Sequence, residues 1–239
     1  MKKIMFLFVV SLFFVSAGNS QDEKSFRLGL FGASNISWFN PSSEWHKNDG
    51  TRPAWGYGLM TEFSLADNYS LETGLYSSYS GGKLKWDSTA TTIVPPDTIP
   101  INVPVKINSE YKFQSLEIPL ALKMKTNEIN SFTFFAKFGG TLSLLIDSKA
   151  DYEYMWGETK ISLDNVNVKK DVIFIRVAFI VGAGIEYSLG GSTSAVLGIN
   201  FNNGLTPIFN TGENSVHRYD DNKKKAINNY VTINLGFIF

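Results

Sequence analysis

The sequence predicts an all-β fold, namely an eight-stranded antiparallel up-and-down transmembrane β-barrel with a plugged polar interior. Three observations predict it. Apolar and polar residues alternate along most of the chain, short and long connections alternate between these segments, and their polar face is rich in glycine. Alternation with a period of two is typical of β-strands that have two different faces. A mean hydropathy of −0.05 is too low for a membrane protein built from several helices.

Composition excludes several classes of protein. The chain has 239 residues, of which 44% are hydrophobic and 18% charged, so it is not intrinsically disordered and fits a single domain. It contains no cysteine, which excludes a disulfide scaffold, an iron–sulfur site, a thiolate zinc site and a cysteine nucleophile. The 22 basic and 22 acidic residues balance, so no net field attracts nucleic acid and we expect no nucleic-acid partner.

The N-terminus has the pattern of a secretory signal. Two lysines precede an apolar run over residues 4–15, and small residues follow, with cleavage expected after Ala17 or Ser20. The apolar run is too short to span a bilayer, because a helix needs about 20 residues. We therefore expect residues 1–20 to be a cleaved signal peptide and residues 21–239 to form the barrel domain.

Eight segments alternate in the way that strands do. Most of them reach or exceed the 9 to 11 residues that a tilted transmembrane strand needs, whereas ordinary strands average about five or six. The predicted strands are residues 25–38, 54–65, 69–79, 111–125, 131–147, 171–188, 193–202 and 227–239.

The connections differ strictly in length. Three are short turns containing Gly, Asn or Asp, at residues 66–68, 126–130 and 189–192. The four others are long, at residues 39–53, 80–110, 148–170 and 203–226. All turns then lie at one end of the sheet and all loops at the other, as in outer-membrane barrels with short periplasmic turns and long external loops. The pattern predicts a location in the cell outer membrane.

The two faces of each strand differ sharply in chemistry. Along residues 116–124, Leu, Ile and Met alternate with Glu, Pro, Ala and Lys. Phe135, Phe174 and Ile180 are exceptions, since they are apolar but fall on the polar face. Glycine on that face suits the narrow interior of eight strands, which has room only for packed side chains. The glycines concerned are Gly56, Gly58, Gly74, Gly139, Gly182, Gly184, Gly198 and Gly236.

The polar face also carries four bases and four acids, which predicts a self-neutralising lumen. An unpaired buried charge costs several kcal/mol, so we interpret the set as a structural network rather than an ion path. Its members are Arg27, Glu62, Glu72, Glu117, Lys123, Lys137, Arg176 and Glu186. The alternative is an exported soluble barrel that binds a hydrophobic ligand, with the apolar faces turned inward.

Several short motifs resemble the PorT-like outer-membrane β-barrel family of Bacteroidetes. They are LETGLY at residues 71–76, LEIPL at 116–120, GAGIEY at 182–187 and GLT at 204–206. Leu235, Phe237 and Phe239 on the closing strand also look like the signal that the barrel assembly machinery reads. The resemblance implies an outer-membrane barrel with a structural or interaction role, accessory to envelope assembly or protein secretion, and it implies no cofactor.

Catalysis and metal binding have little support in the sequence. His46 lies near serines and acids, and His217 lies near Ser215 and Asp220, but no spacing sets a nucleophile against a base. A lipid-modifying outer-membrane enzyme therefore stays a minor alternative. We expect no catalytic residue, no cofactor and no metal site.

The long loops indicate partners. Residues 151–158 alternate acids with aromatics, which fits either an aromatic belt at the membrane interface or a hairpin rising above the membrane. Prolines between residues 95 and 104 predict a stiff second loop, and the charges of residues 220–225 largely cancel. The expected partners are outer-membrane lipids and lipopolysaccharide, the barrel assembly machinery, and an extracellular protein or glycan bound by the loops.

Overall fold

The computed structural model describes residues 26–42, 46–93, 100–210 and 226–239. Their secondary structure is entirely β, and none of these residues forms a helix long and apolar enough to cross a membrane. The strands are β1 (Phe26–Pro41), β2 (Lys47–Asn48), β3 (Arg52–Ala66), β4 (Tyr69–Ile93), β5 (Pro100–Lys125), β6 (Phe132–Trp156), β7 (Thr159–Asn167), β8 (Ile175–Gly190), β9 (Thr193–Gly204) and β10 (Ala226–Ile238).

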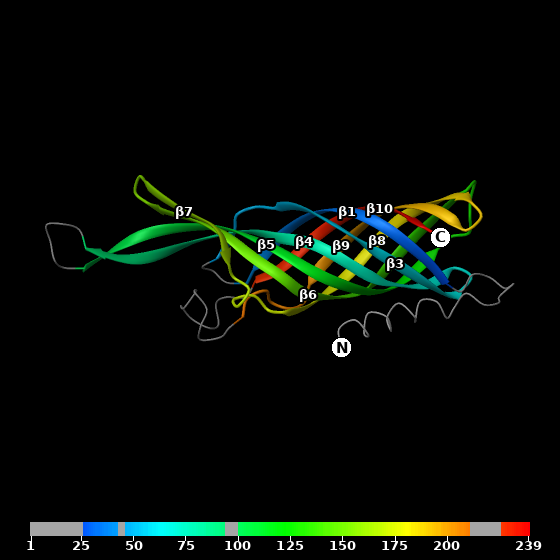
Figure 1. Ribbon diagram of the computed structural model, residues 1–239, viewed down its shortest axis with the longest axis horizontal. Helices are drawn as coiled ribbons and strands as arrows, with labels where there is room; N and C mark the ends of the chain where they lie inside the picture. Colours follow the sequence, from blue (N-terminus) through cyan, green and yellow to red (C-terminus); the bar gives the residue numbers. More distant parts are fainter. Residues whose placement is uncertain (1–25, 43–45, 94–99, 211–225) are drawn as a thin grey trace, which may run out of the picture.

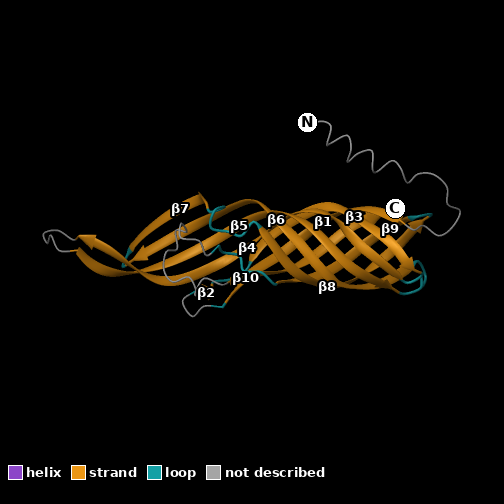
Figure 2. Ribbon diagram, turned by 90° about the horizontal axis from the view of Figure 1, so that it is seen from below, coloured by secondary structure: helices purple, strands orange, loops and turns teal. Residues whose placement is uncertain are grey.

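Eight of these strands close into a ring, which confirms the predicted barrel. The order is β1-β3-β4-β5-β6-β8-β9-β10, and β10 pairs antiparallel with β1 from Gly29↔Ile238 to Pro41↔Ala226. The short turns and the C-terminus gather at one end of the barrel, at the right in Figure 1. The other end carries a long extension, which Figure 2 shows from a second side.

The apolar faces point outward, as the sequence predicts. Leu120 and Leu235 are 57% and 62% exposed, whereas Glu117 and Arg176 are 5% and 8% exposed. An exported soluble barrel with its hydrocarbon inside is therefore excluded for this fold. Of the three apolar exceptions, Phe135 and Ile180 are buried in the lumen, but Phe174 is exposed.

The position of Phe174 follows from a wrong strand boundary. Strand β8 begins at Ile175 rather than at Asp171, so Phe174 lies outside the alternation of the barrel. The residues just before it form an isolated bridge, Val172↔Phe209, which ties two extracellular connections together.

Two of the expected loops are largely strands, which corrects the sequence analysis. Strands β4 and β5 stay paired from Gly81↔Lys112 to Ile93↔Pro100, and β6 continues to Trp156 before it turns back as β7. Pro104 is tolerated because β6 pairs with β5 only from Lys106 onward, so β5 has a free side at that proline.

The lumen has an apolar outer end, which the sequence analysis did not predict. Above the polar section lies a cluster that we call the apolar plug. Two extracellular connections contribute to it together with the barrel strands, and it seals the outer mouth with closely packed aromatic rings. Its members are Phe39, Leu84, Tyr111, Phe113, Leu145, Ala150, Tyr152, Val168, Val172, Ile208, Phe209 and Ala226.

Candidate functional site: the lumen and the extracellular sheet

A cluster of charges fills the lumen near the short turns. The alternation of β1, β3, β4, β5, β6 and β8 directs one or two charged side chains from each strand inward at similar depth. We call this set the lower charge cluster. It comprises Arg27, Glu62, Glu72, Lys123, Lys125, Lys137 and Glu186.

Lys123 lies at the centre of the lower charge cluster. Its ammonium is fully buried and contacts Glu62, lies 2.6 Å from Glu186 and 3.7 Å from Glu72. It also lies 4.2 Å from the centre of the Phe135 ring. These three carboxylates come from β3, β4 and β8. Of these strands only β4 is paired with β5, so the Lys123 side chain also links β5 to two strands that are not its neighbours.

The remaining bases complete the lower charge cluster. Arg27 lies 2.8 Å from Glu186, and Lys137 lies 2.5 Å from Glu72. Lys125, which sequence reasoning missed, lies 2.5 Å from Glu62. Its spacing of two residues from Lys123 was the available signal, because it places both lysines on the same face of β5.

The other two predicted lumen charges lie nearer the apolar plug. Tyr230 donates a hydrogen bond of 2.8 Å to Glu117, and Arg176 donates one of 2.7 Å to Ser115. The Arg176 guanidinium also lies 5.2 Å from the centre of the Phe113 ring. The eight predicted charges thus form two groups rather than one network, with Glu117 and Arg176 apart from the other six.

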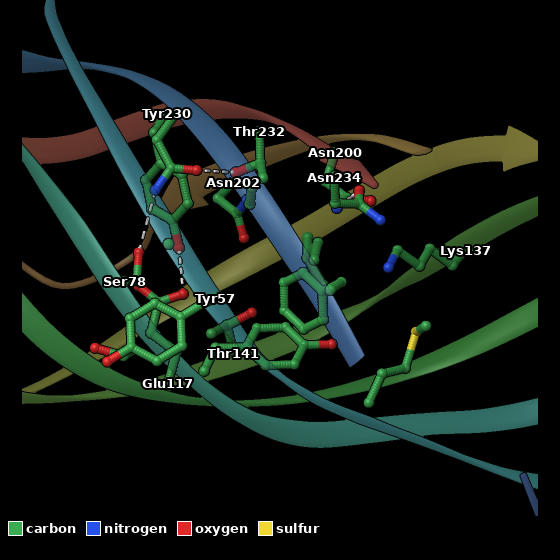
Figure 3. Close-up of a pocket in the computed structure, with 18 residues that line it drawn as sticks. Tyr57, Ser78, Glu117, Lys137, Thr141, Asn200, Asn202, Tyr230, Thr232 and Asn234 are labelled. Carbon is green, nitrogen blue, oxygen red and sulfur yellow. Dashed lines mark hydrogen bonds between the residues drawn. The ribbon is translucent and has the colours of Figure 1, made fainter. Parts of the chain in front are cut away.

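Between the two groups lies a small cavity of about 40 Å³, shown in Figure 3. Glu117 and Lys137 line it from opposite charge groups. Its remaining polar wall is largely asparagine and threonine: Asn200 donates to Asn234 at 3.0 Å, and Thr232 donates to Asn35 at 2.9 Å. A cavity of this size has room for only a few waters.

The asparagines of this wall are the residues that sequence reasoning missed most clearly. They are neutral, so no charge count singled them out, although their alternation on β9 and β10 places them on the polar face. The buried asparagines of the described chain are Asn35, Asn200, Asn202, Asn228, Asn229 and Asn234.

At the turn end, a hollow of about 620 Å³ opens beside the lower charge cluster. Arg27, Glu62, Lys125 and Glu186 form its floor, and turn residues such as Asn68 form its rim. Arg27 and Lys125 are partly exposed to this hollow, whereas Glu62, Glu186 and Lys123 stay buried. The lumen is hydrated at one end, filled along its length and sealed by the apolar plug at the other.

Beyond the barrel, a sheet stands on the extracellular side. We define this extracellular sheet as β2, residues 80–93, 100–113 and 147–156 of β4, β5 and β6, and β7. Ion pairs join neighbouring strands on one of its faces. Lys83 lies 3.5 Å from Glu110, Lys112 lies 2.5 Å from Asp151, and Lys160 lies 2.7 Å from Glu153.

The opposite face of the extracellular sheet is apolar and packs on the apolar plug. Trp86, Ile107, Tyr154 and Val166 are the partly buried residues at this contact. Burial raises the pKa of Tyr152, which belongs to the plug, to about 12. Of the two interpretations of residues 151–158, the structure has the hairpin rising above the membrane. Trp156 is exposed near its tip.

The remaining predicted residues are not brought into one site. The ring of His46 lies 5.0 Å from that of Trp86, whereas His217, Ser215 and Asp220 lie outside the described residues. Within the described chain, no three His, Asp or Glu side chains cluster as metal ligands would. The signal peptide expected at residues 1–20 also lies outside the described residues.

The three residues of the expected assembly signal share the outer face of the last strand. Leu235, Phe237 and Phe239 are exposed on the lipid side of the barrel. The main chain of Phe239 closes the seam, since its N–H donates to Leu28 at 2.8 Å and its carbonyl accepts from Leu28 at 3.2 Å.

Three solved structures are similar to this chain in the course of the backbone. Neisserial surface protein A (NspA) is 9% identical, with a TM-score of 0.45, and the match covers 90% of this chain and 96% of that one. OprG of Pseudomonas aeruginosa is 12% identical, with a TM-score of 0.41 and coverage of 92% and 98%. Ail, the attachment invasion locus protein of Yersinia pestis, is 7% identical, with a TM-score of 0.32 and coverage of 91% and 100%.

No curated protein matches the sequence. A family does: the outer membrane protein beta-barrel domain matches residues 19–210, which is most of the chain. This match agrees with the closed ring of eight strands and with its outward-facing hydrocarbon. The chain therefore belongs to the outer membrane protein beta-barrel domain family, and its location is the cell outer membrane.

Proposed function

We propose that this barrel is a closed anchor that presents the extracellular sheet to a protein or glycan partner. Its role would be structural or interactive, accessory to envelope assembly or protein secretion. One observation carries the proposal: β4, β5 and β6 continue far beyond the lipid-facing band as a sheet, while the lumen beneath them is filled.

The filled lumen argues against transport. Eight strands leave an interior just wide enough for side chains, and here ion pairs and aromatic rings occupy it. The cavity of about 40 Å³ between the two charge groups is too small for a solute of metabolite size. A barrel with a long external sheet above a blocked lumen is better suited to binding a partner than to conducting a solute.

The edge of β7 supports a protein partner. Strand β7 pairs with β6 on one side, and no described strand pairs with its other side. Ile161 and Leu163 on this strand are exposed, as is Trp156 just before it. A free edge with exposed apolar residues favours pairing with an extended segment of another protein, because main-chain hydrogen bonds then give affinity and side chains give selectivity.

The link to envelope assembly or secretion rests on the PorT-like motifs of the sequence. The same proposal includes membership of that family of Bacteroidetes, recognition of the C-terminal residues by the barrel assembly machinery, and contacts with lipopolysaccharide. It assigns no catalytic residue, since no spacing in the sequence sets a nucleophile against a base.

Photo-crosslinking in intact cells tests the interaction. A crosslinking amino acid replaces Ile161 on β7, and a matched variant carries it at Leu197, an exposed apolar residue on the lipid-facing side of β9. We expect a discrete crosslinked species from position 161 that is absent from position 197 and lost when the flanking residues 153–160 and 162–163 are replaced by Gly and Ser with the crosslinking amino acid kept at position 161. Equal crosslinking from both positions, or crosslinking that survives the replacement, contradicts the proposal.

Conductance gives an independent check of the closed lumen. The purified barrel in a planar bilayer is expected to show no stepwise ionic current, because the apolar plug and the lower charge cluster fill the lumen in series. Regular conductance steps from the unmodified protein would overturn the anchor interpretation and favour a channel.

A further inference from the structure

The lipid-facing surface of the barrel is not uniformly convex. A hollow of about 640 Å³ lies on it across β10, β1, β3, β4 and β5. The hollow follows one line of directly paired residues, which therefore lie side by side across five strands. This line is Leu235, Gly32, Tyr57, Ser77 and Leu116.

Two small residues make the floor of the hollow. Gly32 has no side chain, and a Cβ added there would meet no atom within 4 Å. Ser77 is the other small residue of the line. These two positions leave the floor open between the exposed side chains of Leu30, Leu59 and Leu235, which line the hollow.

The walls of the hollow differ in kind. On the extracellular side, Tyr57 lines the hollow. Two residues further along β3, outside the lining, the ring of Trp55 stacks on Tyr57 at 5.6 Å and on Tyr79 with centroids 4.6 Å apart. On the other side, Leu30 and Leu59 stand out from the surface as exposed apolar side chains. Tryptophan and tyrosine gather where membrane meets water, so the ring stack marks the outer boundary of the hydrocarbon.

The line of the hollow rises toward the extracellular side at β5. Leu116 is the last apolar residue on the outward face of β5, because Gln114 and Lys112 follow it on that face. On β10, in contrast, Val231 and Ile233 still lie between Leu235 and the extracellular end of the strand. The hollow therefore opens at its upper end toward the headgroup level of the outer leaflet.

Two basic residues lie beyond that upper end, in the extracellular sheet. Lys112 is four residues beyond Leu116, about 13 Å along the strand at roughly 3.3 Å per residue. Its ammonium lies 2.5 Å from Asp151, and Lys83 on the next strand lies 3.5 Å from Glu110. Each lysine has donors left over, since an ammonium has three, and these are available to a phosphate at the headgroup level.

The surroundings of the hollow favour a hydrocarbon chain as its occupant. The hollow is a recess in the lipid-facing band, where water is absent, and a void would lose the dispersion contacts of every residue that lines it. We propose that the hollow holds one acyl chain of a lipopolysaccharide molecule whose phosphate lies beside Lys112 and Lys83. The hollow lies apart from the β7 edge proposed for a protein partner, and the site rests on the lipopolysaccharide contacts of the proposed function, because Lys112 and Lys83 belong to the extracellular sheet.

Native mass spectrometry of the full chain, extracted from outer membranes in a mild detergent, tests this site. The unmodified barrel is expected to retain one lipopolysaccharide per chain. Gly32→Leu fills the floor of the hollow and is expected to lose most of that retained lipid. Gly140→Leu is the matched control, because Gly140 also faces outward with free space around its Cβ, on β6 away from the hollow.

The outcomes separate the alternatives. Heat-modifiable gel migration establishes that each variant is folded, and Ser77→Leu fills the same floor if Gly32→Leu does not fold. Retention of lipopolysaccharide by the Gly32→Leu or Ser77→Leu variant at the unmodified level overturns the site. So does retention of a glycerophospholipid in its place, or a dimer of this chain that Gly32→Leu dissociates. Loss in the hollow variants together with retention in Gly140→Leu supports it.

Discussion

Tyr230 on β10 donates a hydrogen bond of 2.8 Å to Glu117 on β5, across the full width of the lumen. In the ring order these two strands lie opposite each other, with three strands between them on either side. The bond is therefore a tie between opposite walls of the barrel rather than between neighbours. Both side chains are buried, so the phenol satisfies a carboxylate that water reaches only through small cavities.

Replacing Tyr230 with Phe removes this tie and leaves the ring in place. A hydrogen bond to a charged group is worth about 1.5–3 kcal/mol, so we expect a loss of that size in the free energy of unfolding. Equilibrium unfolding by urea in lipid vesicles measures it. The control is Tyr187→Phe, since Tyr187 is exposed on the outer face of β8. Equal losses in the two variants would show that the bond across the lumen contributes nothing special.

Replacing Lys123 with Met is expected to be more damaging. It leaves Glu62, Glu72 and Glu186 without their shared central base, and breaking a buried charge pair costs about 3–5 kcal/mol. Thermal unfolding followed by heat-modifiable migration measures the loss. Lys85→Met is the matched control, because Lys85 pairs with Asp49 at the exposed surface, where such pairs are worth about 0–1 kcal/mol. A Lys123→Met barrel as stable as the control would contradict a central role for this lysine.

The sequence predicted the barrel because a bilayer imposes one rule on every spanning strand. Hydrocarbon faces out and small or polar groups face in, so strands such as β10 carry a clean alternation. Above the membrane the rule reverses. On β4, Lys83 and Lys85 face outward while Leu84 faces the apolar plug. Alternation continues there with the opposite polarity, and together with the prolines of β5 it suggested a loop where the structure has strands.

The lumen was predictable only in part. The alternation along each strand predicts that the eight charged side chains point into the lumen. It does not predict which of them come into contact across strands that are not neighbours. Lys123 reaches Glu186 two strands away in the ring order, and Glu117 meets Tyr230 rather than a base. Such partners depend on the shear of the closed ring. The neutral asparagines of the cavity wall gave no electrostatic signal at all.

Two adjacent glycines on β6 provide a test of inside against outside. A Cβ at Gly139 would lie 2.1 Å from the Leu120 carbonyl oxygen, whereas at Gly140 its nearest neighbour is 3.7 Å away. We expect Gly139→Ala to lower stability by roughly 1–3 kcal/mol, as overpacking does, and to reduce the folded yield. Gly140→Ala should be close to neutral. Refolding yields in detergent measure both, and a reversed order would contradict the observed facing of β6.

Acid is expected to loosen the β6–β7 hairpin. Asp151 lies outside the membrane, beyond Ile146, and accepts hydrogen bonds from Lys112 at 2.5 Å and from the Asn165 N–H at 2.8 Å. Partial burial opposes its ionisation, but the hydrogen bond from the Lys112 ammonium and that from Asn165 outweigh this and lower the pKa of Asp151.

Because the folded pKa lies below the unfolded one, the stabilisation is complete above the ordinary aspartate value of about 3.9 and is lost as pH falls through the folded pKa. Amide hydrogen exchange of β7, corrected for its intrinsic pH dependence, measures the loosening. Asp151→Asn should weaken protection at neutral pH and remove this acid dependence. If the variant loosens with acid as the unmodified chain does, another group is responsible.

The last residue offers a way to separate assembly from stability. The main chain of Phe239 pairs with Leu28, so Phe239→Ser keeps the hydrogen bonds that close the seam and removes only an exposed ring. Phe134→Ser removes a ring that is equally exposed to lipid, on β6. Both variants should lose similar, small amounts of stability after refolding in vitro. If the C-terminal residues are read by the barrel assembly machinery, Phe239→Ser alone should accumulate unassembled chain in cells, measured by heat-modifiable migration of pulse-labelled protein. Equal accumulation of unassembled chain in the two variants would show that Phe239 has no role in assembly beyond that of any lipid-facing residue.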